Sequence, residues 1–271
     1  MEDPGYIAGR GALAAAGAVA VAVPSDADGL DVAEGVRRAP AARLALVAPS
    51  HAMPLGGALP IARRLALLDW AARADSWLLE DDADSEFRWQ GKPLPPLASL
   101  DRGGRVIYCG TFSKSLAPAL RLGFAVLPAA LVDAFVRART LMDRGPGVLA
   151  QAVLADYMAQ GSLAPHIRRM RTEYARRRQA LLEALARHCP EVTPVAAAGG
   201  LHLVLLLPPR ADEAAVVRSA RARGLAVSPL GACFVGPPRL AGLVAGFAAT
   251  PTMRAAEAAR RLSAAVRSVA P

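Results

Sequence analysis

Residues 105–123 read RVIYCGTFSKSLAPALRLG and contain Lys114, one of only two lysines in a chain whose other cationic side chains are arginines. The other lysine, Lys92, lies in a Pro/Gly-rich segment typical of a surface loop. A lysine amine can lose its proton and attack a carbonyl, whereas the guanidinium of arginine cannot. Lys114 is therefore the first candidate for a chemical role.

Apolar strands alternate with amphipathic helices around this stretch, which predicts an α/β fold with a mostly parallel sheet flanked by helices. A helix is predicted over residues 61–74, and strands over residues 43–48, 76–79, 105–109 and 120–127. In open α/β sheets, ligands bind beyond the carboxyl ends of the strands. We therefore expect His51, Asp81 and Lys114, which each follow a strand, to converge on one site.

The second half of the sequence predicts a smaller α/β unit that follows long arginine-rich helices. Its elements are expected as strands near residues 192–195, 200–207, 225–228 and 243–248, and as helices near 212–223 and 252–269. We expect a large unit over residues 1–165, and a linking helix with a small C-terminal domain over residues 166–271.

Composition narrows the class of protein. Hydrophobic residues make up 54% of the chain, but none of its apolar segments is long enough to span a membrane. The Ala/Val-rich residues 11–24 follow two acidic residues, so we expect a helix and a strand there rather than a signal peptide. The formal net charge is +9, but the arginines are scattered and predict solvated helix faces rather than a nucleic-acid surface. Three cysteines without metal-type spacing fit the reducing cytoplasm.

The groups around Lys114 suit one cofactor. A lysine that bonds pyridoxal phosphate needs a carboxylate at the pyridine nitrogen, with hydroxyl and cationic groups at the phosphate. Asp81 follows one strand, while Thr111, Ser113 and Arg121 flank Lys114. By spacing alone, a solvent-facing Ser-Lys loop remains an equal alternative.

Longer motifs carry a resemblance to a known family. They are Leu79–Arg88, Val106–Lys114 and Leu120–Gly123, with further matches at Glu2–Tyr6, Pro49–His51, Leu141–Pro146 and His166–Arg171. Together they resemble the MocR-type branch of the fold type I, aspartate-aminotransferase-like proteins. Members of this branch join a GntR-type winged-helix DNA-binding domain to an aminotransferase-like domain that binds pyridoxal phosphate and senses a ligand.

The resemblance implies a role for each candidate residue. Lys114 would form the internal aldimine and exchange it with an amino compound. The implied cofactor contacts are Asp81 at the pyridine nitrogen, Thr111, Ser113 and Arg121 at the phosphate, and Tyr6 and His51 near the ring. The resemblance also implies a cytoplasmic homodimer with an amino-compound, amino-acid or keto-acid ligand, and transaminase activity if the site is active. Neighbouring polar residues are expected to be structural: Asp82, Asp84 and Glu86 as loop carboxylates or caps, His166 and His202 as packing residues.

The sequence also departs from the family pattern. Ala83 stands where the family has a tyrosine, and Val244 lies near the position of a substrate-binding arginine, with Arg239 a weak substitute. The winged helix and the early Gly-rich turn are not found, so we expect a misassigned start or a truncated copy that does not bind DNA alone. A non-catalytic remnant or interaction protein, with weak or no cofactor binding, remains the alternative.

Overall fold

The central sheet determines where the candidate residues lie. The structure is a computed structural model that describes residues 1–145 and 147–269. Its central strands run in the order β4-β5-β6-β7, with bounds Leu44–Val47, Trp77–Asp82, Val106–Thr111 and Gly123–Val126. The first three are parallel, and β7 is antiparallel to β6. The chain therefore leaves β4, β5 and β6 at one edge of the sheet.

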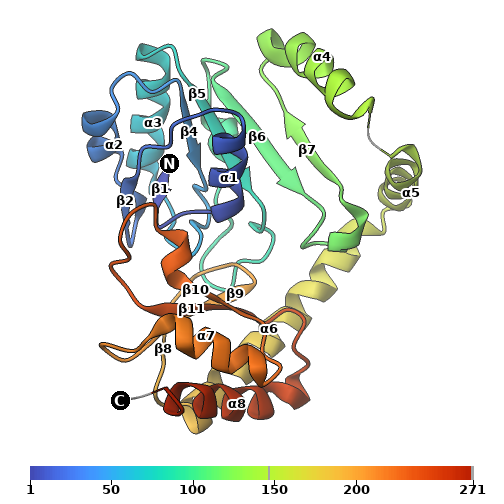
Figure 1. Ribbon diagram of the computed structural model, residues 1–271. Coiled ribbons are helices and arrows are strands. Elements are labelled where there is room, and N and C mark those ends of the chain that lie inside the picture. The colour runs from blue at the N-terminus through green and yellow to red at the C-terminus, as the bar shows by residue number, and fades with distance from the viewer. Residues whose placement is uncertain (146, 270–271) are drawn as a thin grey trace.

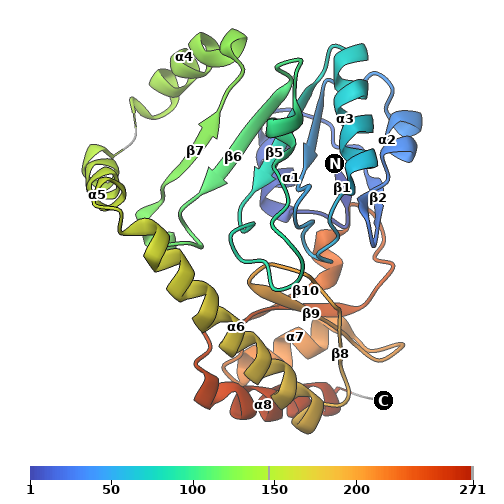
Figure 2. The same cartoon turned by 180° about the vertical axis from the view of Figure 1, so that it is seen from behind.

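Helices cover both faces of this sheet. Figures 1 and 2 show α1 (Ile7–Ala15) and α3 (Ile61–Arg73) on opposite faces. Leu67 and Trp70 of α3 are buried in one cluster with Val47 of β4 and Leu78 of β5. Burial of a side chain of this size contributes roughly 1.5–3 kcal/mol, so this layer holds the sheet and its carboxyl edge in place.

The N-terminal segment forms a small sheet beside the central one. β1 (Glu2–Asp3) pairs in parallel with β2 (Val23–Asp26), which pairs antiparallel with β3 (Gly29–Leu30). Helix α2 (Val32–Arg38) follows, and the Asp31 side chain caps it by accepting a hydrogen bond from the Glu34 N–H at 3.0 Å. The expected helix followed by a strand within residues 11–24 is found as α1 and the first residues of β2.

The C-terminal half is a second, wholly antiparallel sheet. Its strand order is β10-β11-β9-β8, with bounds Val227–Pro229, Gly242–Gly246, His202–Leu206 and Thr193–Pro194. The long helix α6 (Leu163–His188) packs on it together with α7 (Glu213–Ala222) and α8 (Ala255–Arg267) (Figure 1). Leu185, Leu203 and Leu262 are buried in the shared core.

Two helices connect the two halves. α4 (Val132–Asp143) and α5 (Val148–Ala159) lead from β7 to α6 along the outer side of the molecule (Figure 2). They carry exposed apolar side chains, among them Leu141 and Leu149. Pro146, which ends one of the matched sequence motifs, lies outside the described residues. Among the residues that the structure describes, no helix is long and apolar enough to cross a membrane.

Two strand predictions need correction. The predicted strand over residues 120–127 begins only at Gly123, because Pro118–Leu120 form a 3₁₀ turn and Arg121 adopts a left-handed conformation with φ 50°. The strand predicted at residues 76–79 continues to Asp82, through the acidic cluster. Glu80 can lie inside this strand because its buried carboxylate accepts hydrogen bonds from the N–H groups of Leu97 and Ala98, at 2.7 and 2.8 Å.

Candidate functional site

The carboxyl edge of the central sheet brings a lysine, a carboxylate and a histidine into contact. Lys114 Nζ lies 3.1 Å from Oδ2 of Asp84, and His51 Nδ1 lies 3.1 Å from Oδ1 of the same carboxylate. The three residues come from the segments after β6, β5 and β4. The predicted convergence at this edge is therefore present for His51 and Lys114. However, the carboxylate that both contact is Asp84, which was predicted to be a loop carboxylate or a cap.

The Asp84 carboxylate is ionised. Only 8% of its side chain is exposed. Burial raises the pKa of Asp84, but the hydrogen bonds and charges of His51 and Lys114 outweigh it and hold this pKa well below the usual range. Because an ionised carboxylate only accepts hydrogen bonds, His51 Nδ1 is the donor. The other ring nitrogen, Nε2, is buried and has no hydrogen-bond partner among the described residues.

Asp81 lies beside this cluster with its carboxylate unengaged. It is a half-buried residue near the end of β5, and no hydrogen bond or ion pair involves its side chain in the described part of the chain. Burial raises the pKa of Asp81, and the nearby charge of Lys114 opposes that rise. Asp81 is therefore a carboxylate close to Lys114 that remains available to a ligand.

The loop that carries Lys114 is closed by short-range hydrogen bonds. The Thr111 hydroxyl lies 3.0 Å from the Ser113 hydroxyl and accepts a hydrogen bond from the Ser113 N–H at 3.1 Å. The Phe112 N–H donates to the Leu122 carbonyl at 3.1 Å. This last bond brings Arg121, the neighbour of Leu122, back beside the Thr111–Ser113 turn. Arg121 is exposed, and within the described ranges its guanidinium makes no hydrogen bond or ion pair. Two hydroxyls and one cation therefore share this end of β6.

Helix α6 fixes the loop from the other side. His166 Nε2 donates to the Ser115 carbonyl at 2.9 Å, and Arg169 donates to His166 Nδ1 at 3.2 Å. Since a guanidinium only donates, Nδ1 must be the acceptor and Nε2 must carry the proton. His202 similarly contacts the Pro54 carbonyl through Nε2 at 2.8 Å. Both histidines thus hold backbone segments near the site.

Two other candidates lie apart from the lysine. Tyr6 is the residue before α1, and its exposed side chain makes no hydrogen bond with Lys114 within residues 1–145 and 147–269. Arg239 donates to the backbone carbonyl and the carboxylate of Asp3, at 2.8 and 3.1 Å. Because Asp3 holds this guanidinium, Arg239 does not replace an arginine near Val244.

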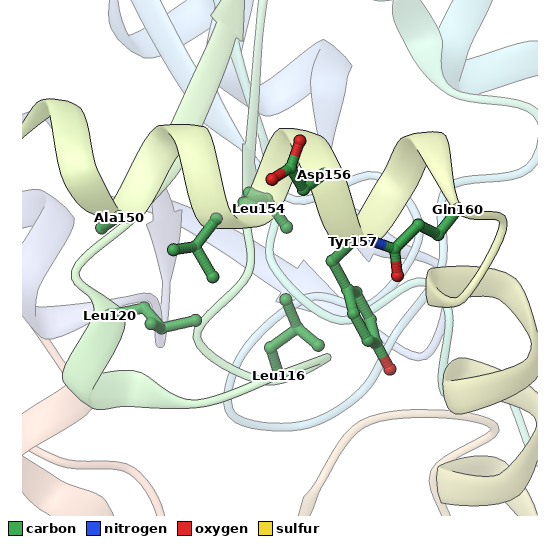
Figure 3. A pocket seen from close by; sticks show the side chains of 8 residues that line it. Leu116, Leu120, Ala150, Leu154, Asp156, Tyr157 and Gln160 are labelled. Atoms are coloured by element: carbon green, nitrogen blue, oxygen red, sulfur yellow. The ribbon is translucent and has the colours of Figure 1, made fainter.

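An apolar pocket of about 390 Å³ lies beyond the lysine loop (Figure 3). Leu116 and Leu120 of the loop face Leu154 and Tyr157 of α5 across it. None of the candidate polar residues lines this pocket. The charged cluster around Lys114 and the apolar pocket are therefore separate features of the same loop.

Comparisons with known proteins identify the fold and the family. A model of the aminotransferase class I and II family matches residues 1–262. The chain belongs to the class I and II aminotransferase family. Its structure matches that of LysN, the α-aminoadipate aminotransferase of Thermus thermophilus, solved as a complex with N-(5'-phosphopyridoxyl)-L-leucine. The TM-score is 0.90 at 28% sequence identity, and the match covers 99% of this chain and 70% of LysN.

Regulators are also among the relatives of this aminotransferase chain. It is 39% identical to the probable rhizopine catabolism regulatory protein MocR of Rhizobium meliloti, over 92% of the chain and 50% of that protein. It is 37% identical to the pyridoxine biosynthesis regulator PdxR of Corynebacterium glutamicum, over 91% of the chain and 53% of that protein. The chain thus spans about half the length of these relatives. The predicted fold type I architecture and the predicted resemblance to MocR-type regulators are confirmed.

The site fits the family's cofactor, pyridoxal phosphate. The cofactor is an aldehyde with a basic ring nitrogen and a phosphate dianion. The site offers a primary amine on Lys114, an unengaged half-buried carboxylate on Asp81, and hydroxyl groups beside an unengaged arginine. Each chemical group of the cofactor therefore has a complementary group at the carboxyl edge of the sheet.

Proposed function

We propose that this chain is the pyridoxal-phosphate-binding, effector-sensing part of a MocR-like transcriptional regulator. Lys114 would form the covalent bond to the cofactor, and an amino compound would take the place of the lysine in that bond and release its amine. One observation carries the proposal: the partly exposed side chain of Lys114 lies beside Asp81 and Asp84, at the edge of the sheet where this fold binds ligands.

Each residue of the proposed site would hold a different part of the cofactor. Asp81 would accept a hydrogen bond from the protonated ring nitrogen, and Thr111, Ser113 and Arg121 would bind the phosphate. When bound, the cofactor supplies a carbonyl for the lysine and a ring that accepts electrons from an adjacent carbanion. His51 acts through Asp84 rather than on the ring, because its Nδ1 faces that carboxylate and its Nε2 is buried. Tyr6, which makes no hydrogen bond with Lys114 among the residues that the structure describes, would lie near the ring of the bound cofactor.

Sensing is favoured over full transamination. Ala83 supplies no hydroxyl to the cofactor, and the guanidinium of Arg239 is held by Asp3, so neither offers the additional contact that a transaminase of this type uses. The ligand in this proposal is an amino compound or an amino or keto acid, and the working form is a cytoplasmic homodimer. We further propose a boundary near residue 165 between a cofactor-binding unit and a linking helix with a C-terminal unit.

An absorbance titration with pyridoxal phosphate tests the proposal. We expect the wild-type protein to develop an absorption band near the visible edge, and an added amino compound to change it. Lys114→Ala should abolish the band, whereas Lys92→Ala, which removes the other lysine, should leave it intact. A wild-type spectrum at saturating cofactor that equals the sum of the protein and free-cofactor spectra, or equal bands in both variants, would contradict the assignment of Lys114.

A further inference from the structure

Asp84 is the residue at the site for which the family resemblance gives no role. Its Oδ2 lies 3.1 Å from Lys114 Nζ, and 36% of the lysine side chain remains exposed. Asp84 itself is almost wholly buried, so the contact pairs a partly exposed cation with a buried anion. Buried carboxylates are retained when they are paired, and their loss leaves the partner charge uncompensated.

His51 fixes the orientation of this carboxylate. The imidazole donates through Nδ1 to Oδ1 of Asp84, which leaves Oδ2 directed at the lysine. The imidazole is held in turn by the C-terminal half of the chain. A Cβ atom on Gly200 would lie only 2.0 Å from His51 Cε1, and the ring of His202 lies 5.4 Å away, centroid to centroid. The ring therefore has little room to rotate.

We propose that Asp84 is the positioning residue of Lys114: its buried carboxylate holds Nζ at the edge of the sheet in the cofactor-free protein, and His51 keeps the carboxylate in place. The contact with Asp84 keeps Nζ of Lys114 placed and engaged until a ligand replaces the carboxylate as its partner. This inference rests on the proposed function, in which Lys114 is the cofactor lysine.

The chain offers an internal control for a test without cofactor. Lys92 and Lys114 are its only lysines, and Lys92 is exposed in a surface segment. Limited acetylation of cofactor-free protein with acetic anhydride at neutral pH, followed by peptide mass spectrometry, gives the ratio of Lys114 to Lys92 modification. We expect Asp84→Asn to raise this ratio severalfold, because the variant releases Nζ from its ion pair with a buried carboxylate and leaves it free to reach the reagent.

Matched variants distinguish the positioning of Lys114 by Asp84 from the loss of any nearby negative charge and from a failure to fold. Asp82→Asn removes a carboxylate from the same segment, but Asp82 contacts the Tyr108 hydroxyl at 2.7 Å, so we expect an unchanged ratio. His51→Leu removes the donor to Asp84 and should raise the ratio, while His51→Asn keeps an N–H donor and should restore the wild-type value. If Asp84→Asn does not fold, the two His51 variants decide the question.

The inference is overturned if Asp84→Asn leaves the ratio at the wild-type value, if Asp82→Asn raises it equally, or if the two His51 variants behave alike. The cofactor titration is independent of this result. If Asp84→Asn changes the acetylation ratio but the wild type shows no cofactor band, the positioning role of Asp84 stands and the proposed function fails. If the band appears and the ratio does not change, the proposed function stands and the positioning role fails.

Discussion

The Gly200→Ala variant tests how tightly the C-terminal half closes on His51. Gly200 has φ +83°, a left-handed conformation that costs an alanine roughly 1–2 kcal/mol. The added methyl group would also lie 2.0 Å from His51 Cε1, well inside van der Waals contact. Forcing a methyl group into a packed region costs about 1–3 kcal/mol. We therefore expect Gly200→Ala to lower the free energy of unfolding by roughly 2–5 kcal/mol.

A second glycine isolates the contribution of the backbone. Gly17 has φ +82°, and a Cβ atom added there would meet nothing within 4 Å. Gly17→Ala should therefore show the conformational cost alone, about 1–2 kcal/mol. Urea denaturation followed by circular dichroism measures both variants. If Gly200→Ala destabilises the protein no more than Gly17→Ala does, the close packing of Gly200 on His51 is refuted.

Two buried glutamates give further predictions about stability. Burial raises the pKa of Glu2 from 4.5 to about 7, so the folded chain holds this proton more tightly than the unfolded chain. The resulting stabilisation is complete below the unfolded pKa and is lost as the pH rises through about 7. The free energy of unfolding of Glu2→Gln should therefore exceed that of the wild type by up to roughly 3 kcal/mol at pH ~8.5, and should equal it at pH ~4. A difference between the two urea midpoints that does not change with pH would contradict this. Glu80→Ala removes the acceptor of the Leu97 and Ala98 N–H groups, and should lower the urea-derived stability by about 2–4 kcal/mol, whereas Glu80→Gln keeps an acceptor and should lose less.

The lysine and the edge of the sheet could be predicted from the sequence for physical reasons. Lys114 stands out because arginine, which cannot act as a nucleophile, replaces lysine almost everywhere else in the chain. Its strand and the strand before Asp81 read as short apolar runs, and parallel strands bring their carboxyl ends to one edge. Local sequence information is therefore enough to place these residues after neighbouring parallel strands. That the edge where they meet binds a cofactor stays a prediction.

The sequence could not show which of three neighbouring carboxylates contacts Lys114. Asp81, Asp82 and Asp84 follow one another without a period that distinguishes them. Their partners depend on how far β5 extends and on the turn that follows, which places Asp82 against Tyr108 and Asp84 against Lys114. The engagement of Arg239 by Asp3 was equally hidden, because these residues are separated by almost the whole chain.

The local sequence pattern also could not predict the direction of β7. An apolar run predicts a strand but not whether it runs parallel or antiparallel to its neighbour. The 3₁₀ turn at Pro118–Leu120 and the left-handed Arg121 reverse the chain, so that Gly123 pairs with Thr111. This reversal is what places Arg121 beside the hydroxyl groups at the end of β6.

Borohydride trapping tests directly whether Lys114 is the residue that bonds the cofactor. The protein is incubated with pyridoxal phosphate, reduced, digested and mapped by mass spectrometry, with Lys92 as the competing amine in the same chain. We predict stoichiometric phosphopyridoxyl modification of Lys114, with Lys92 largely unmodified. Equal modification of both lysines, or none at Lys114, would contradict the claim that Lys114 is the cofactor lysine.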